Sequence, residues 1–223
     1  MEISDFNITQ FQNLLLAWFK KNRRDFPWRL DGLTSYQLII SEILLQRTKA
    51  ETASNFYSLF IAEFPDWKSL ANSSQENLSA FLRPIGLYNQ RATRLIQLAK
   101  HMLALNSKIP LERERIDKIP FMGQYIANAV ELLIHERQKP LIDVNMARVL
   151  ERYFGPREKA DIRYDDYLQT LAHRVVKHEN SKEISWAILD FAAIICQARK
   201  PKCLECSLSE NCKFFNNCII PYI

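Results

Sequence analysis

The sequence predicts an all-α fold, and two observations carry this prediction. Apolar residues recur three and four positions apart along most of the 223-residue chain, whereas the strict alternation typical of strands is nearly absent. Glycine, which weakens helices, occurs only four times. With 48% hydrophobic and 25% charged residues, and no apolar run near the ~20 residues that cross a bilayer, we expect a globular protein without a membrane segment.

The apolar stripes and the residues that flank them place the helices. In chain order, the stripes are Ile8, Phe11, Leu15 and Phe19; Phe56, Leu59, Phe60 and Phe64; and Ala92, Leu95, Ile96, Ala99 and Met102. Thr34 can cap a helix that runs to about Gln46, and Gly155-Pro156 ends a helix that begins after Asp143. No low-complexity linker or repeat interrupts the chain, so any division into lobes must be tertiary.

Charge and the N-terminal residues bear on partners and compartment. A net charge of +5 allows a polyanionic partner, although many proteins without such a partner share it. The first six residues lack the basic start and apolar stretch of a secretion signal. We therefore expect a cytoplasmic protein with reduced thiols. We also expect it to be a monomer.

All five cysteines lie between Cys196 and Cys218, and four of them form a ligand-like pattern. Cys196, Cys203, Cys206 and Cys212 follow the spacing C-x6-C-x2-C-x5-C, directly after a predicted helix from Trp186 to Ile195. Four thiolates in one short loop can hold a [4Fe-4S] cluster. A four-cysteine zinc knot is the alternative, but such modules usually pair two C-x2-4-C knuckles and this loop has one.

This cysteine spacing resembles the loop that closes the helix-hairpin-helix, iron-sulfur DNA glycosylases, the family of endonuclease III and the adenine-mismatch glycosylases. The resemblance implies a [4Fe-4S] cofactor and a duplex DNA partner, which would bring the protein to the nucleoid. It also implies that Arg199, Lys200 and Lys202 lie against the DNA backbone; the alternative is ordinary solvated charge.

The segment 119–127, Ile-Pro-Phe-Met-Gly-Gln-Tyr-Ile-Ala, resembles the family's helix-hairpin-helix. In that motif a tight turn before a helix presents backbone N–H groups to a phosphate, which here implies DNA contacts at Gly123 and Gln124. Phe121 stands where the family usually has a second glycine. Without the resemblance, the segment would be an ordinary connection between helices.

The segment 142–149 resembles the one that carries the family's essential aspartate, which is Asp143 here. Read alone, Asp143 is a good N-cap for the helix that follows, and both roles can hold together. We expect the helix N-terminus to lower the pKa of Asp143, so that it is ionised at neutral pH. Its charge would stabilise the oxocarbenium-like sugar that forms when a glycosidic bond breaks.

A second carboxylate, Glu42, lies in a polar stripe on an otherwise apolar helix. The stripe consists of Ser35, Glu42, Gln46 and Lys49, and taken alone it would face water. The segment 41–48 resembles the family's pocket helix, which implies that Glu42 lies in the base pocket. Apolar neighbours would raise its pKa and suit it to handle the departing base, while Gln46 and Arg47 would fill the gap left by the flipped base or touch the opposite guanine.

Further stretches, 24–29, 85–92 and 190–193, extend the resemblance over almost the whole chain. It implies that Trp28 and Tyr88, otherwise plain core aromatics, lie near the pocket or the DNA. It also implies two helical lobes with DNA bound in a cleft between them. A six-helix lobe with the hairpin would span 30–137, and an iron-sulfur cluster lobe would join 1–29 to 138–223.

The residue at position 125 bears on the reaction. Endonuclease III has a lysine there, whose amine attacks the sugar and nicks the strand, and the phenol of Tyr125 cannot do so. With Glu42, Arg47 and Asp143, Tyr125 most resembles the thymine-DNA mismatch glycosylases, which implies hydrolytic removal of thymine or uracil opposite guanine with little strand cleavage.

Two other functions stay open. One is removal of adenine opposite guanine or 8-oxoguanine, although the eleven residues after Cys212 are too few for the extra domain usual in that group. The other is a non-catalytic iron-sulfur DNA-binding protein. The presence of both Glu42 and Asp143 argues against it, because binding phosphates requires neither carboxylate.

Overall fold

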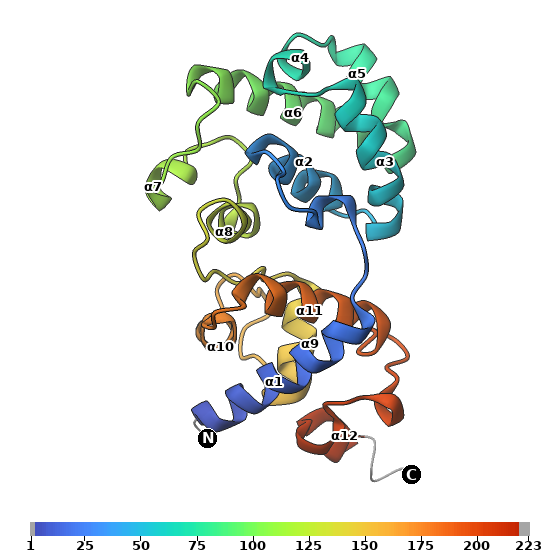
Figure 1. Cartoon of the computed structure of the whole chain (residues 1–223), viewed down its shortest axis with the longest axis vertical. Coiled ribbons are helices and arrows are strands. Elements are labelled where there is room, and N and C mark those ends of the chain that lie inside the picture. Colours follow the sequence, from blue (N-terminus) through green and yellow to red (C-terminus); the bar gives the residue numbers. More distant parts are fainter. Residues whose placement is uncertain (1–2, 219–223) are drawn as a thin grey trace. The chain divides into compact units, whose positions relative to one another are not determined.

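The structure, a computed structural model that describes residues 3–218, is built from α-helices and short 3-10 turns (Figure 1). No strand occurs within that range, which confirms the predicted all-α class. No helix of the described residues is long and apolar enough to cross a membrane. The last five residues of the C-terminal tail, 219–223, lie outside the described range.

The chain divides into two compact units. Asp25–His135 forms one, and the described residues up to Arg24 join those from Glu136 onward to form the other. For comparison, the sequence places the corresponding lobe boundaries at residues 30 and 137. Each unit is described by itself below.

The Asp25–His135 unit contains seven helices. They are α2 (Ser35–Leu45), α3 (Ala50–Glu63), α4 (Trp67–Ala71), α5 (Gln75–Leu82), α6 (Tyr88–Ala104), α7 (Arg113–Ile116) and α8 (Gln124–Leu133), with 3-10 turns η1 (Pro27–Arg29) and η2 (Arg83–Ile85). The family resemblance implies six helices for this lobe, so the structure has one more. α4 and α7, of five and four residues, are too short for an apolar period to reveal. α2 packs against α8 and α3, and α6 packs against α4 and α5.

One apolar core fills this unit, and its aromatic rings interlock. Phe60 is fully buried and lies 5.2 Å from Phe64 and 6.2 Å from Phe56, measured between ring centroids. Leu59, in the same predicted stripe, is 62% exposed, so this part of the prediction is wrong. The buried residues of α3 lie on one side of the helix, and Leu59, like Ser58 before it, lies on the exposed side.

The other unit combines the first helix of the chain with the last ones. It contains α1 (Asp5–Asn22), α9 (Val144–Phe154), α10 (Asp166–Val176), α11 (Ser181–Ile194), α12 (Lys213–Cys218) and two 3-10 turns, η3 (Cys203–Glu205) and η4 (Ser209–Asn211). α1 packs along α11 and also contacts α10, and α11 packs on α9 (Figure 1). The buried ring of Phe11 on α1 lies 4.9 Å from Tyr153 and 5.2 Å from Phe154.

A buried ion pair ties the end of α1 to α11. Asp190 is fully buried, and its carboxylate accepts from the backbone N–H of Arg24 at 3.0 Å and from its guanidinium Nε at 2.8 Å. Arg24 and Asp190, which belong to two of the stretches on which the family resemblance rests, therefore meet in this unit. Replacing either partner would remove these hydrogen bonds from the other polar group in a largely buried place.

Candidate active site and DNA-contacting elements

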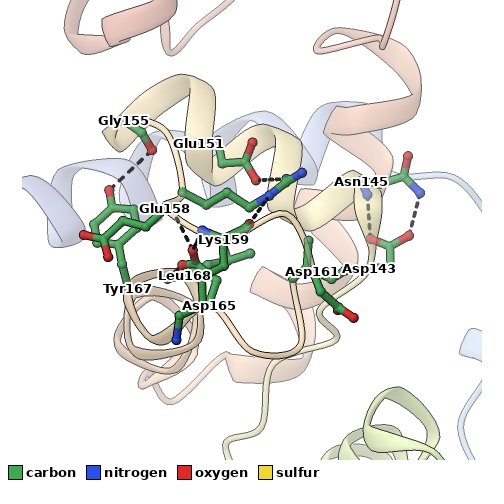
Figure 2. Close-up of polar contacts among 12 residues, drawn as sticks. Asp143, Asn145, Glu151, Gly155, Glu158, Lys159, Asp161, Asp165, Tyr167 and Leu168 are labelled. Carbon is green, nitrogen blue, oxygen red and sulfur yellow. Dashed lines mark hydrogen bonds and ion pairs between the residues drawn. The ribbon is translucent and has the colours of Figure 1, made fainter.

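Asp143 caps α9, as the sequence predicts. Its Oδ1 accepts from the backbone N–H groups of Asn145 at 2.9 Å and Met146 at 2.8 Å, and its Oδ2 accepts from the side-chain amide of Asn145 at 2.6 Å (Figure 2). These three bonds fix the carboxylate against the first turn of the helix. Asp143 as a whole residue is half-buried at the start of α9.

The expected lowering of the Asp143 pKa is wrong. Burial raises the pKa of Asp143 above its ordinary value of 3.8 and outweighs the hydrogen bonds from Met146 and Asn145 and the charge of Arg148, all of which lower it. The sequence argument counted the helix terminus alone. It had no access to the degree of desolvation, which disfavours the charged form.

This raised pKa gives a prediction for the pH dependence of base release. If the reaction needs ionised Asp143, the rate falls about tenfold per pH unit once the pH drops below the folded-state pKa. Because that pKa lies above 3.8, the decline begins at a higher pH than for an ordinary aspartate. Single-turnover rates between about pH 3 and 8 measure this, and an acid limb centred below 3.8 would contradict the assignment.

Arg148 connects the support of Asp143 to the cysteine loop. Its Nη1 donates to the side-chain oxygen of Asn145 at 3.2 Å, and its Nε donates to the carbonyl of Cys196 at 2.9 Å. A third bond, from Nη2, reaches the carbonyl of Ala192 at 3.0 Å. The rotamer of Asn145, and through it the Asp143 carboxylate, therefore depends on the backbone at the first cysteine.

The four predicted cluster ligands line one cavity. Cys196, Cys203, Cys206 and Cys212 surround it together with apolar side chains that include Leu208, Phe214 and Phe215. Burial raises the pKa of the Cys206 thiol to about 11 and also raises those of Cys203 and Cys212. Across residues 3–218, no three His, Cys, Asp or Glu side chains are spaced as ligands of one metal ion.

Arg152, which sequence reasoning missed, reaches across this cavity. Its Nη1 donates to the sulfur of Cys196 at 3.3 Å and to the carbonyl of Gln197 at 2.8 Å. Its guanidinium also lies 4.7 Å from the ring centroid of Phe214. A cation that donates to a cysteine sulfur favours the thiolate, the form that binds a metal or an iron-sulfur cluster, so these four thiols with this donor would suit such a group. The cluster itself stays a prediction.

Arg199, Lys200 and Lys202 are all exposed in the loop between Cys196 and Cys203. Their exposure suits both a contact with DNA and ordinary solvation, and the role predicted for them stays a prediction.

Glu42 does not face water. It is 5% exposed on α2 and lines a narrow space against α8, beside Ile126, Ala129 and Val130. Within the predicted polar stripe, Glu42 is thus buried, whereas Gln46 and Lys49 are exposed. Asp143 belongs to the other unit, so the convergence of the two carboxylates on one base stays a prediction.

The predicted hairpin is formed by α7, a tight turn and α8. Within the turn the N–H of Met122 donates to the carbonyl of Ile119 at 3.2 Å, and Gly123 caps α8. Phe121 adopts a φ of 67°, so it takes the left-handed conformation that favours glycine. The turn therefore forms without the family's second glycine, and the ring of Phe121 is 38% exposed with Arg94 5.4 Å from its centroid.

Gly123 itself has no conformational need to be glycine. Its φ is −64°, which any residue adopts, and a Cβ built there would meet nothing within 4 Å. Neither backbone strain nor packing within the unit explains the missing side chain. The contact of Gly123 with DNA stays a prediction, and Gln124 and Tyr125 follow at once as the first, half-buried residues of α8.

The turn after α2 exposes Gln46 and Arg47. Arg47 has a φ of 57°, and the carbonyl of Gln46 accepts from the guanidinium of Arg91 on α6. Sequence reasoning missed Arg91, which is only 6% exposed. One signal was available, because Arg91 lies four and seven positions before Leu95 and Leu98 on the apolar stripe of α6.

The two predicted pocket aromatics have different surroundings. Trp28, at 6% exposure, is a core residue that stacks on Phe26 with 4.8 Å between ring centroids. Tyr88 is 38% exposed at the start of α6, with the guanidinium of Arg83 5.8 Å from its ring centroid. Of these two side chains, Tyr88 is the one exposed to a partner. The predicted role of Trp28 and Tyr88 in a base pocket stays a prediction.

Comparison with known proteins agrees with this arrangement. Residues 40–176 match the family described as "HhH-GPD superfamily base excision DNA repair protein". The chain is 34% identical over 215 residues to "Thymine-DNA glycosylase" from Aeropyrum pernix, covering 94% of this chain and 96% of that protein. It is 30% identical to "Adenine DNA glycosylase" from Mycobacterium tuberculosis, covering 87% of this chain but 64% of that protein.

A solved structure titled as a thermostable thymine-DNA glycosylase shares the fold. It superposes with a TM-score of 0.88 at 31% identity, covering 95% of this chain and 98% of that one. The match to the family, the near full-length likeness to its members and the shared all-helical fold establish that this chain belongs to the HhH-GPD superfamily of base excision DNA repair proteins.

Proposed function

We propose that this protein is a mismatch-specific DNA glycosylase that hydrolyses the N-glycosidic bond of thymine or uracil opposite guanine. The observation that carries the proposal is the likeness to a thymine-DNA glycosylase over nearly the full length of both chains. The protein is thus a hydrolase of N-glycosyl bonds that acts on duplex DNA. It must rotate the target nucleotide out of the stack, which costs least for a mispaired base.

Asp143 is the proposed catalytic carboxylate. Its two backbone N–H bonds and the Asn145 amide hold it in one orientation, so little reorganisation is needed when positive charge develops on the sugar. The half-buried carboxylate would also hold the attacking water. The proposed reaction uses its ionised form, which burial disfavours by raising the pKa of Asp143.

Tyr125 makes the reaction hydrolytic in this proposal. A phenol cannot form a Schiff base with the sugar, so strand cleavage by the protein itself should be weak or absent. Glu42 is the proposed group that handles the proton of the departing base, because its carboxyl is shielded from water between α2 and α8.

We also infer that the cysteine loop holds a [4Fe-4S] cluster. Cys196, Cys203, Cys206 and Cys212 would be its ligands, and Arg152 would donate to the first of them. The cluster would supply a structural anchor for the loop. The support is their common cavity, the apolar lining and the cationic donor. Monomeric state and cytoplasmic location stay predictions.

Base release from defined duplexes tests the proposed activity. End-labelled duplexes with G:T, G:U, A:G or A opposite 8-oxoguanine are incubated with excess protein and scored with and without alkali. We expect cleavage at T and U opposite G that requires alkali, because a hydrolytic enzyme leaves an intact abasic strand. Cleavage only at adenine would move the protein to the adenine group, and no cleavage on any duplex would favour a binding protein.

A substitution at Gly123 tests the hairpin as a DNA contact. Gly123→Ala should leave the melting temperature nearly unchanged, because its φ and open surroundings accept a Cβ. It should weaken duplex affinity about tenfold, since the methyl group would hold a phosphate away from the backbone N–H groups.

Gly32→Ala provides the matched control. Gly32 has a φ of 78°, so the methyl group should cost about 1 kcal/mol of folding stability and leave DNA affinity unchanged. Parent-like affinity in Gly123→Ala would remove the hairpin from the DNA interface.

A further inference from the structure

The guanidinium of Arg91 joins two turns of the Asp25–His135 unit. Arg91 lies in the first turn of α6 and is buried, at 6% exposure. Its hydrogen bonds reach the carbonyls of Ile43 (2.9 Å), Leu44 (3.2 Å), Gln46 (2.5 Å) and Gly86 (3.1 Å) and the hydroxyl of Thr48 (2.7 Å). The turn that follows α2 and the turn that precedes α6 therefore share one side chain.

The chemistry of these contacts requires arginine. Ile43 and Leu44 belong to the last turn of α2, where the carbonyls run out of regular i+4 partners and form the negative end of the helix dipole. The Ile43 carbonyl also accepts a turn bond from the N–H of Gln46 at 3.3 Å. A cation there is favourable, and a planar fork of five N–H donors can satisfy several carbonyls in fixed directions. The ammonium of lysine is a single point with the same charge, so it cannot bond both turns in the same geometry.

Both turns contain backbone that needs an external restraint. Arg47 and Leu87 are L-residues with positive φ, 57° and 52°, and Gly86 has a φ of 71°. A left-handed L-residue is strained and persists only where the surroundings over-determine it. Arg47 and Leu87 are exposed, so burial of their own side chains does not provide that restraint. The bonds from Arg91 to Gln46 and Gly86, one residue before each, do provide it.

We propose that Arg91 is a positioning residue for base extrusion, which fixes the Gln46–Arg47 turn and the Leu87–Tyr88 turn as one rigid DNA-facing element. The inference rests on the proposed glycosylase function. Side chains that enter the stack at the gap of a flipped nucleotide must hold their positions against the collapse of the duplex. A loosened turn would therefore slow extrusion without altering the bond-breaking chemistry at Asp143.

Comparing two substrates separates extrusion from chemistry. One duplex carries a G:T mismatch and the other carries the same thymine as a single-base bulge, which has no partner and is cheaper to extrude. Arg91→Lys should reduce single-turnover base release from G:T by about 10–100-fold and from the bulge by less than about threefold. Fluorescence of 2-aminopurine beside the target should fall in the G:T complex, while affinity for matched duplex is retained.

Three controls make the outcome decisive. Lys100→Met removes an exposed charge from the same helix and should change neither rate. Thr48→Val removes one acceptor of the Arg91 guanidinium and should lower the base-release rate on G:T about 3–10-fold. If Arg91→Lys shows no cooperative thermal unfolding and is therefore not folded, Thr48→Val takes its place in the test. Equal losses on both substrates, or no loss in folded variants, would overturn the proposal. An inactive parent with normal 2-aminopurine fluorescence would instead count against the proposed function.

Discussion

Asp143→Asn is expected to reduce base release by about 10³-fold or more while mismatch affinity stays within a few-fold of the parent. Asparagine keeps the shape and the capping oxygen but cannot carry the charge that the oxocarbenium-like sugar requires. Single-turnover rates and duplex affinities on the same preparation measure both quantities. Parent-like activity in the variant would remove Asp143 from the mechanism.

The same substitution should leave stability at neutral pH unchanged or increase it. Burial raises the pKa of Asp143 in the folded state, so the folded protein disfavours the ionised form relative to the unfolded chain. Stability from this group is present below the unfolded pKa and is lost as the pH rises through the folded pKa. A neutral side chain avoids that loss, so activity and stability should move in opposite directions.

Asp165→Asn is the matched control, because Asp165 caps α10 in the same unit (Figure 2). Its carboxylate accepts from the N–H groups of Glu158, Lys159 and Leu168 at 2.6–2.7 Å, and these bonds lower its pKa despite burial. A carboxylate with a lowered pKa stabilises the folded protein at pH values above its unfolded-state pKa. This variant should therefore lose about 2 kcal/mol of folding free energy at pH 7 and keep the base-release activity of the parent. If both variants lost stability alike, the opposite pKa shifts would be refuted.

Cys206→Ser should have the second large effect, through the proposed cluster. The parent should purify yellow-brown with about four irons and four sulfides per chain, and the variant should be colourless. Without its anchor the loop would release the Cys196 carbonyl that holds Arg148, and with it the Asn145 support of Asp143. We therefore expect a lower melting temperature and loss of base release together.

Cys218→Ser serves as its control, because this cysteine falls outside the four-residue spacing. That variant should keep colour, metal content and activity. If the parent is colourless and contains one zinc per chain, the four cysteines hold a zinc ion and the [4Fe-4S] assignment is wrong. A parent without bound metal would leave the loop held by Arg152 and its apolar contacts alone.

Local sequence rules predicted the helices well and the conformation of the turns poorly. Thr34 caps α2, and Gly155, with a φ of 121°, ends α9, because short polar caps and left-handed glycines are set by neighbouring residues. Phe121 shows where such rules stop. Phenylalanine by itself prefers a negative φ, so its residue type does not predict the φ of 67° at Phe121. The geometry of the whole hairpin imposes this positive φ.

Long-range polar contacts could not be read from the chain. Asp143 was placed correctly at its helix start, but its pKa depends on desolvation, which the whole unit determines. Arg91 reaches carbonyls more than forty positions away, and Arg152 reaches the cysteine loop at a similar separation. Hydrophobic periodicity shows which face of a helix is buried, but it does not show which backbone carbonyls lie against that face.

The discontinuous unit sets an order of events during synthesis. α1 is translated before the whole Asp25–His135 unit, yet Phe11 and Leu15 become fully buried only against helices made much later. At ribosomal speeds the delay between α1 and α11 is about 10–30 s, during which the apolar face of α1 has no native cover. The middle unit can complete its own contacts in that interval. The first helix is therefore the segment for which chaperone binding during translation should matter most.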